Sequence, residues 1–132
     1  MTTDVDYVTP KDNVYEVAVK MKEDNVGMIP VIEHDTLIGV ITDRDLVVDG
    51  IAEKRPGSTR VTDVMQHTLI TANPEMSEEE AARLMSENQV RRLPVLENGK
   101  LVGIVSLGDL ALSHKGNDTA GDALEEISKD TN

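Results

Sequence analysis

Apolar residues recur with the same order of spacings in two halves of the chain. Each half begins with a helix-capping pattern, Asn13-x-x-Glu16 in the first and Ser77-x-x-Glu80 in the second. Apolar side chains then follow three or four residues apart, as on one face of a helix. They are Val14, Val17, Ala18 and Met21 in the first half and Ala81, Leu84 and Met85 in the second. The pattern predicts a helix of about three turns in each half.

Two short apolar runs follow each predicted helix. They span 28–32 and 37–41 in the first half, and 93–96 and 101–105 in the second. The second pair is separated by a turn with Asn98-Gly99, which is typical of a tight hairpin. Because apolar and polar residues do not alternate within the runs, both faces of the strands must be covered. Each half therefore predicts a helix followed by a buried β-hairpin.

The two halves are copies of one unit. Residues 7–46 align with 71–110 at a constant offset of 64, without a gap, and 13 of the 40 positions are identical. An ungapped match of this length indicates an internal structural repeat. One copy of about 60 residues would have a marginal core. We therefore expect the two copies to fold together as one pseudo-symmetric unit.

The repeat also predicts the domain boundaries. Repeat 1 spans 1–56, repeat 2 spans 57–118 and begins with the connecting segment, and 119–132 is a polar tail. Within the tail, residues 119–128 have apolar side chains at helical spacing. This segment is either an amphipathic helix that docks elsewhere or a frayed end.

Composition narrows the class of protein. The chain has 132 residues, a net charge of −12, two tyrosines as its only aromatic residues, and no cysteine. The core must be built from Val, Ile, Leu, Met and Ala, and cysteine-based zinc sites and disulfides are excluded. The acidic balance argues against nucleic-acid binding. With no signal peptide and no apolar run approaching roughly 20 residues, we expect a soluble cytoplasmic protein without a membrane partner.

A polar motif occurs at the end of the last predicted strand of each copy: Thr42-x-x-Asp45 and Ser106-x-x-Asp109. A hydroxyl followed by an acid three residues later can simply cap a helix. The same geometry also suits a ligand, because a helix N-terminus attracts a phosphate and an ionised Asp accepts from the paired hydroxyls of a ribose. The spacing alone leaves both roles open.

Taken together, these elements resemble the cystathionine β-synthase (CBS) domain pair, or Bateman module. The pieces typical of that family are 42–46 (TDRDL), 90–95 (VRRLPV), 103–110 (GIVSLGDL) and the connecting 61–65 (VTDVM). The resemblance covers about residues 4–112. It implies an α/β (α+β) fold of two tandem β-α-β-β-α repeats, packed about a pseudo-two-fold axis with two related clefts.

The resemblance further implies a sensor rather than a catalyst. Members of the family bind adenosine-containing ligands such as AMP, ADP, ATP or S-adenosylmethionine, require no cofactor, and commonly form a disc-like homodimer through their helices. The regulated protein partner is not identified by the sequence.

The family's usual roles apply to both copies of the motif. Thr42 and Ser106 would face a phosphate or ribose, and Asp45 and Asp109 would face the ribose hydroxyls. The resemblance implies that each cleft combines the motif of one repeat with segments of the other. One cleft would contain Thr42, Asp45, Ile70, Thr71, Val90 and the Arg91-Arg92 pair; the second would contain Ser106, Asp109, Tyr7, Val8, Val26, Gly27 and Met28.

Arg91-Arg92 distinguishes the two predicted clefts, because it aligns with Gly27-Met28. A guanidinium can bind a phosphate through two hydrogen bonds, and a methionine cannot. We therefore expect the Asp45 cleft to be the better site for a phosphorylated nucleotide. The second would be empty or take a less charged adenosine ligand. The alternative is that the arginines are surface charges paired with Glu87 or Glu97.

The remaining polar residues do not suggest catalysis or a metal site. His34, His67 and His114 have no acid or serine spaced for a catalytic relay, and we expect them to be exposed. Glu78-Glu79-Glu80 is expected to be a solvated helix start. Gly39 and Gly103, inside predicted strands, would permit close approach of backbone or ligand.

The predicted function is therefore a non-enzymatic regulatory module that binds an adenine nucleotide. The alternative is a structural dimerisation or protein-interaction module in which the two motifs only cap helices. An enzyme acting alone is disfavoured by the missing catalytic groups.

Overall fold

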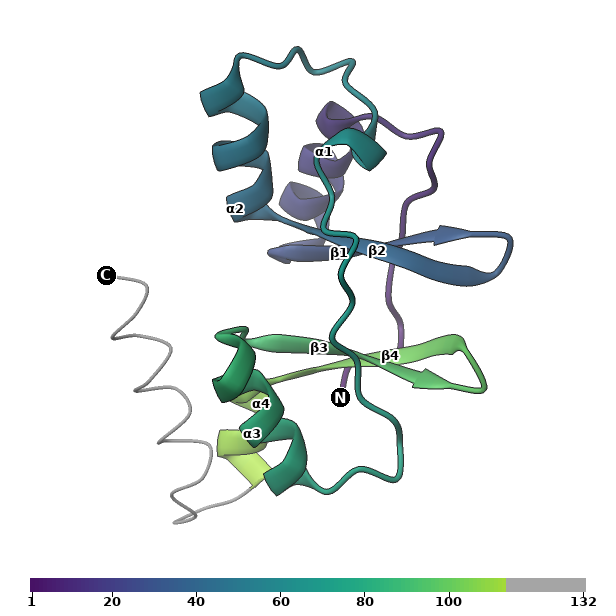
Figure 1. Ribbon diagram of the computed structural model, residues 1–132, viewed down its shortest axis with the longest axis vertical. Helices are drawn as coiled ribbons and strands as arrows, with labels where there is room; N and C mark the ends of the chain where they lie inside the picture. Colours follow the sequence, from purple (N-terminus) through teal and green to yellow (C-terminus); the bar gives the residue numbers. More distant parts are fainter. Residues whose placement is uncertain (114–132) are drawn as a thin grey trace. The chain divides into compact units, whose positions relative to one another are not determined.

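The computed structural model describes residues 1–113, which form parts of two compact units (Figure 1). The first-repeat unit is Asp6–Leu69, and the second-repeat unit joins Met1–Val5 to the chain from Ile70 onward. The boundaries predicted from the repeat, 1–56, 57–118 and 119–132, stay predictions. The proposed helix at 119–128 lies outside the described residues.

Both units contain the same order of helix, two strands and helix. The first-repeat unit contains α1 (Val14–Asp24), β1 (Met28–Glu33), β2 (Thr36–Thr42), α2 (Asp43–Asp45), the π-helical η1 (Leu46–Gly50) and the 3-10 turns η2 (Ile51–Glu53) and η3 (Val61–Asp63). The second-repeat unit contains α3 (Glu78–Asn88), β3 (Arg92–Glu97), β4 (Lys100–Ser106) and α4 (Leu107–Ser113). The segment α2–η2 is one continuous helical run in Figure 1.

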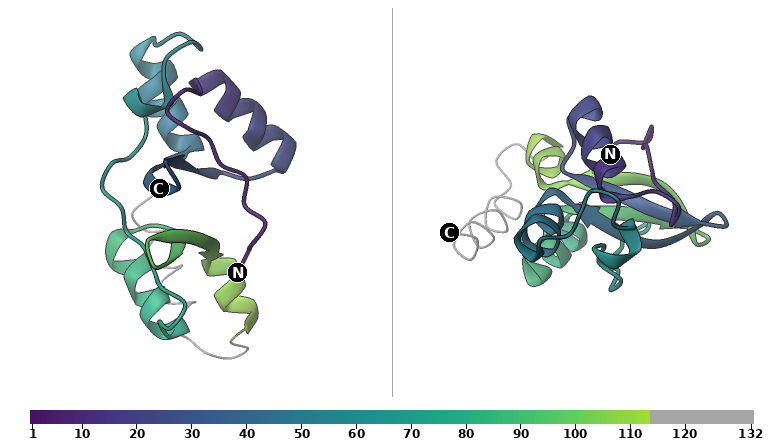
Figure 2. Two further views of the ribbon diagram at one scale, coloured as in Figure 1. Left: turned by 90° about the vertical axis from the view of Figure 1, so that its right-hand side faces the viewer. Right: turned by 90° about the horizontal axis from the view of Figure 1, so that it is seen from above.

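In each unit the helices lie on one side of the hairpin. Figures 1 and 2 show α1 and the α2–η2 run on the same side of β1 and β2, and α1 contacts η1. Likewise α3 and α4 contact each other on one side of β3 and β4. The mixed α and β fold predicted from the sequence is confirmed.

The first helix of each unit begins at the predicted cap. The Asn13 side chain accepts a hydrogen bond from Glu16 N (2.9 Å), and Ser77 Oγ accepts from Glu80 N (3.1 Å). Val14, Val17 and Met21 are buried, and Ala18 is exposed. Ala18 lies at the edge of the apolar stripe defined by the other three.

Both hairpins close through two residues with positive φ. His34 (φ 50°) and Asp35 (φ 64°) join β1 to β2, and Asn98 (φ 54°) and Gly99 (φ 80°) join β3 to β4. Two consecutive positive φ angles are the geometry of a type I′ turn, whose twist matches that of antiparallel strands. The tight hairpin predicted at Asn98-Gly99 is confirmed.

Each hairpin carries a one-residue bridge on both of its edges. On one edge Val8 pairs in parallel with Val31, and Ala72 pairs in the same way with Val95. These bridges complete the predicted β-α-β-β-α order. The other edges pair Gln66 with Val40 and Thr2 with Ile104. Gln66 and Thr2 are 64 residues apart, so the repeat extends to the segment before residue 7.

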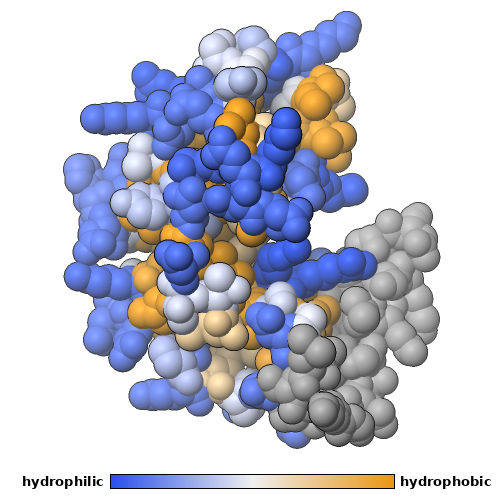
Figure 3. All heavy atoms as spheres, turned by 180° about the vertical axis from the view of Figure 1, so that it is seen from behind, coloured by the Kyte–Doolittle hydropathy of each residue, from blue (hydrophilic) through white to orange (hydrophobic). Residues whose placement is uncertain are grey.

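The two cores are aliphatic, as the composition predicts. Four consecutive residues of β1, Met28 to Val31, are buried, which confirms that both faces of this strand are covered. The first-repeat core consists of Val8, Val14, Val17, Met21, Ile29, Val31, Ile41, Val61, Val64 and Met65. The second-repeat core consists of Ala72, Ala81, Ala82, Met85, Leu93, Val95, Leu107 and Leu110. Hydrophilic side chains cover much of the face in Figure 3, as expected for a chain with 25 acidic and 13 basic residues.

Candidate ligand-binding site

The Thr42-x-x-Asp45 motif is a closed capping box at the end of β2. Asp45 N donates to Thr42 Oγ1 (3.1 Å), and Thr42 N donates to the Asp45 Oδ2 atom (2.8 Å). The hydroxyl and the carboxylate thereby satisfy two backbone N–H groups at the helix start. The capping role predicted for this motif is confirmed.

Asp45 is buried and has a further partner that the sequence analysis missed. Only 7% of its surface is exposed. The side-chain amide of Gln66 donates to Oδ1 and Oδ2 of Asp45, at 3.1 Å to each. A buried carboxylate requires such donors because removing it from water is costly. The sequence gives no signal for this contact, because the 64-residue offset pairs Gln66 with Thr2, which has no side-chain amide.

Gly39 lets Gln66 approach the motif. The Gln66 N–H donates to Val40 O (2.8 Å), and the Val40 N–H donates to Gln66 O (3.2 Å). A Cβ on Gly39 would lie 2.7 Å from Gln66 O and 2.7 Å from Met65 Sδ. The close backbone approach predicted for Gly39 is confirmed. It also occurs at Gly103, where a Cβ would lie 2.7 Å from Thr2 O.

The Ser106-x-x-Asp109 motif forms the same capping box at the end of β4. Asp109 N donates to Ser106 Oγ (3.1 Å), and Ser106 N donates to Asp109 Oδ2 (3.1 Å). The carboxylate is more open than that of Asp45, because 40% of its side chain is exposed. The Met1 ammonium lies 3.9 Å from Oδ2. The two copies therefore share their backbone contacts and differ in the groups around the carboxylate.

In each unit, the segment before the proline of the first hairpin strand lies beside the Thr/Ser-x-x-Asp motif of the same unit. Asp43 N donates to Gly27 O (3.0 Å), and Met28 pairs with Thr42 across the hairpin. In the second-repeat unit Leu107 N donates to Arg91 O (2.9 Å), and Arg92 pairs with Ser106.

The side chains of these two segments differ in exposure. Val26, Arg91 and Arg92 are exposed, whereas Met28 is buried. The prediction that Arg92 acts together with Asp45 stays a prediction.

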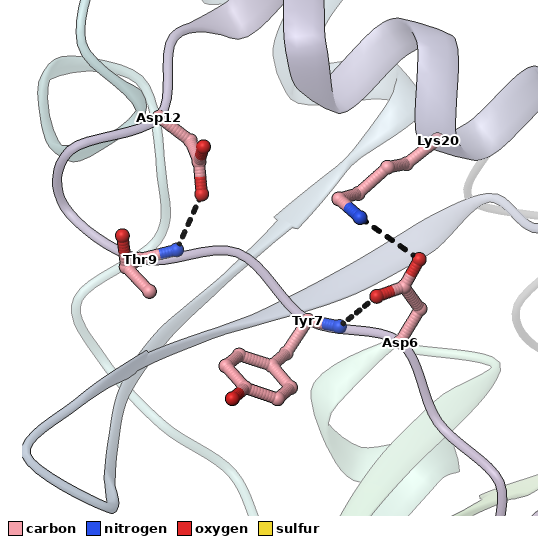
Figure 4. Close-up of polar contacts among 5 residues, drawn as sticks. All are labelled: Asp6, Tyr7, Thr9, Asp12 and Lys20. Atoms are coloured by element: carbon pink, nitrogen blue, oxygen red, sulfur yellow. Dashed lines mark hydrogen bonds and ion pairs between the residues drawn. The ribbon is translucent and has the colours of Figure 1, made fainter.

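The Tyr7-Val8 segment is fixed to the first-repeat unit by local polar contacts (Figure 4). The Asp6 carboxylate accepts from Tyr7 N (3.0 Å) and from Lys20 Nζ (3.0 Å), and Thr9 N donates to Asp12 (2.8 Å). The Lys20 hydrogen bond lowers the pKa of Asp6, and the same bond raises the pKa of Lys20. Val8 is fully buried, which leaves Tyr7 (49% exposed) as the member of the pair that solvent can reach.

The other predicted site residues are half-buried in the second-repeat unit. Ile70 and Val90 pack against its core, and Thr71 directly precedes the bridging Ala72. Part of the surface of each of these residues is therefore already covered by the protein.

The remaining polar candidates are exposed. His34 and His67 are exposed as predicted, and His114 lies outside the described residues. Glu78, Glu79 and Glu80 form the exposed first turn of α3, also as predicted. Within residues 1–113 no three His, Asp or Glu side chains are grouped as a metal site would require. None of the helices in the same range combines the length and apolar character needed to cross a membrane.

Comparison with known proteins identifies the family. The model of the CBS domain matches residues 1–48 and 61–113. The chain belongs to the CBS domain family. This CBS domain chain is 52% identical to the uncharacterized protein YlbB of Bacillus subtilis (strain 168), over all of the chain and 90% of that protein.

Solved CBS domain structures agree with this fold. One is a putative signal-transduction protein with CBS domains from Burkholderia ambifaria MC40-6, with a TM-score of 0.80 and 34% identity over 87% of this chain and 85% of that one. Another is CBSX2 in complex with AMP, with a TM-score of 0.74 and 32% identity over 86% of this chain and 90% of that one.

Proposed function

We propose that this CBS domain protein is a non-enzymatic regulatory module that binds an adenine nucleotide, AMP, ADP or ATP, through its two Thr/Ser-x-x-Asp motifs. The observation that carries the proposal is the pair of matching carboxylates, Asp45 and Asp109, each held by the same capping box. The AMP complex of the related CBSX2 supports the choice of ligand. S-adenosylmethionine is a further candidate of the same adenosine class.

The chemistry of the motif suits a ribose. An ionised carboxylate only accepts hydrogen bonds, and the 2′- and 3′-hydroxyls of a ribose are two adjacent donors. In each motif one backbone N–H uses part of the capacity of Oδ2. The hydroxyls of Thr42 and Ser106 accept from a backbone N–H, so their own O–H can donate to a phosphate or ribose oxygen.

The exposed arginines supply the positive charge that a phosphate requires. Arg91 and Arg92 end in guanidinium groups, which bind phosphate oxygens through two parallel hydrogen bonds. The equivalent Gly27 and Met28 have no such group. In an acidic protein these arginines provide local attraction that opposes the repulsion of the nucleotide by the net charge of −12.

We also propose that the protein forms a homodimer and transmits the bound state to a protein partner. The support is an apolar surface on the α2–η2 run: Val47, Val48 and Ile51 are exposed by 56%, 41% and 73%. Neighbouring exposed apolar side chains of this kind mark interaction surfaces. A ligand that binds one arrangement of the dimer better than another shifts the population toward that arrangement.

A second candidate function is a structural interaction module without a nucleotide. It is favoured by the closure of both capping boxes, which explains the motifs without any ligand. Thermal melting and calorimetric titration with AMP, ADP, ATP and S-adenosylmethionine separate the two functions. A ligand at 100 times its Kd adds about 2.7 kcal/mol of stability. Binding of none of the four would refute nucleotide binding and favour the interaction module.

A further inference from the structure

Gln66 occupies the acceptor atoms that the proposed ligand needs. Its side-chain amide donates to both carboxylate oxygens of Asp45, at 3.1 Å to each, and Thr42 N donates to Oδ2 at 2.8 Å. A carboxylate oxygen accepts about two hydrogen bonds. Oδ2 is therefore saturated, and Oδ1 retains room for one further donor. A ribose diol that binds both oxygens must displace the Gln66 amide.

The Gln66 side chain can leave without disturbing the fold. Its backbone is fixed by two hydrogen bonds to Val40 (2.8 and 3.2 Å). The residue is exposed, whereas Asp45 beneath its amide is buried. Rotation of the side chain into solvent thus exposes Asp45 and leaves the bridge to β2 intact. The free energy lost is mainly that of the hydrogen bonds to the carboxylate.

Among residues 1–113 the second motif has no equivalent amide. Thr2 occupies the matching position and forms the matching bridge, with two hydrogen bonds to Ile104 of 2.9 Å each. Its side chain is shorter than that of glutamine and has no amide group. The Asp109 side chain is 40% exposed. A ribose would therefore meet a partly exposed carboxylate at Asp109, with the Met1 ammonium 3.9 Å from Oδ2, and at Asp45 a buried carboxylate that already accepts from an amide.

We infer that Gln66 is a built-in competitor for the ribose hydroxyls at Asp45, which lowers nucleotide affinity there and makes the two motifs unequal. The inference rests on the proposed nucleotide binding. It reverses the order of nucleotide affinity predicted from Arg92, in which the Asp45 cleft was the better site. The Asp109 motif binds nucleotide first, and the Asp45 motif binds it at higher nucleotide concentration.

The test compares AMP titrations of full-length variants in which only the Asp45 motif binds. Asp109→Asn provides the background, and Gln66→Met is added because methionine has similar length but no donor. Hydrogen bonds to charged groups contribute about 1.5–3 kcal/mol, so we expect at least about tenfold tighter AMP binding in the double variant. The converse variant, Thr2→Gln in an Asp45→Asn background, should weaken AMP binding at Asp109.

NMR of the Gln66 side-chain amide gives a second readout in the wild-type protein. We expect this resonance to move toward that of a solvated glutamine at the higher AMP concentrations that fill the Asp45 motif. If AMP binds the Asp109→Asn protein but Gln66→Met does not tighten it, or the resonance does not move, the inference is wrong and the proposed function stands. If no variant and no wild-type protein binds AMP, the inference fails, and the proposed function fails with it when ADP, ATP and S-adenosylmethionine do not bind either. Binding that appears only after Gln66→Met supports both.

Discussion

The carbonyl oxygen of Gln66 lies 2.7 Å from the position that a Cβ on Gly39 would occupy. Neighbouring Met65 Sδ is equally close to that position. The absent side chain is therefore what allows the connecting segment to pair with β2 and brings the Gln66 amide to Asp45. The same relationship at Gly103 brings Thr2 to β4.

Gly39→Ala should destabilise the protein, because the new methyl group would force the Gln66 backbone away from β2. Overpacking of this kind costs about 1–3 kcal/mol. Chemical denaturation monitored by circular dichroism measures the loss. Gly50→Ala is the matched control, since its Cβ would have nothing closer than Asp45 O at 4.0 Å. Equal stability of the two variants would contradict the steric role of Gly39.

Gly99→Ala should destabilise the second hairpin. Gly99 has φ +80° with open space around its Cβ position, so the cost comes from the backbone conformation alone. A left-handed conformation costs a residue with a Cβ about 1–2 kcal/mol. The measurement is the free energy of unfolding, with Gly108→Ala in α4 as the control. An unchanged value for Gly99→Ala would mean that the turn can adopt another geometry at no cost.

Arg92→Ala should weaken AMP binding and leave adenosine binding unchanged, because the guanidinium is proposed to contact the phosphate. Loss of hydrogen bonds to a charged group corresponds to about tenfold in Kd. Arg83→Ala, at an exposed position of α3, serves as the charge-matched control. Calorimetric titration of each protein with AMP and with adenosine measures the two affinities. Equal AMP affinity in the Arg92→Ala and Arg83→Ala proteins would remove Arg92 from the site.

Ile51→Glu should shift the proposed homodimer toward monomer. Ile51 is 73% exposed, the most of the three apolar residues of the proposed interface, and a buried unpaired carboxylate opposes association. Light scattering over a range of protein concentrations measures the change. Lys22→Ala on α1 makes the same change in net charge on an exposed residue. A wild-type protein that is monomeric at all concentrations would exclude this interface.

The contribution of Lys20 to stability should decrease in acid. Its ion pair with Asp6 lowers the pKa of that carboxyl, so the stabilisation is present above the unfolded-state pKa of Asp6 and is lost as pH falls through the folded-state value. Both side chains are partly exposed, at 33% for Lys20 and 46% for Asp6, so we expect an effect below about 1 kcal/mol near neutral pH. Unfolding of wild type and Lys20→Met from pH 7 to 2 tests this, with Lys22→Met as the control. A difference that grows in acid would contradict the assignment.

The sequence by itself determined the local structure and the repeat. Caps such as Asn13-x-x-Glu16, the Asn98-Gly99 turn and the apolar runs depend on interactions between residues close in the chain, and these follow from residue type and spacing. The 64-residue offset also showed that Thr42-x-x-Asp45 has a twin at Ser106-x-x-Asp109. The capping boxes and the mixed fold were predictable for this reason.

Only the tertiary structure decided what surrounds each motif. Gln66 reaches Asp45 from 21 residues away, through a bridge to β2 that no local pattern encodes. Ala18 is exposed although it recurs at helical spacing with the buried Val14, Val17 and Met21, because burial depends on what packs against α1. Two motifs that share the Thr/Ser-x-x-Asp pattern therefore differ in burial and in hydrogen-bond partners, because those properties depend on contacts between segments distant in the chain.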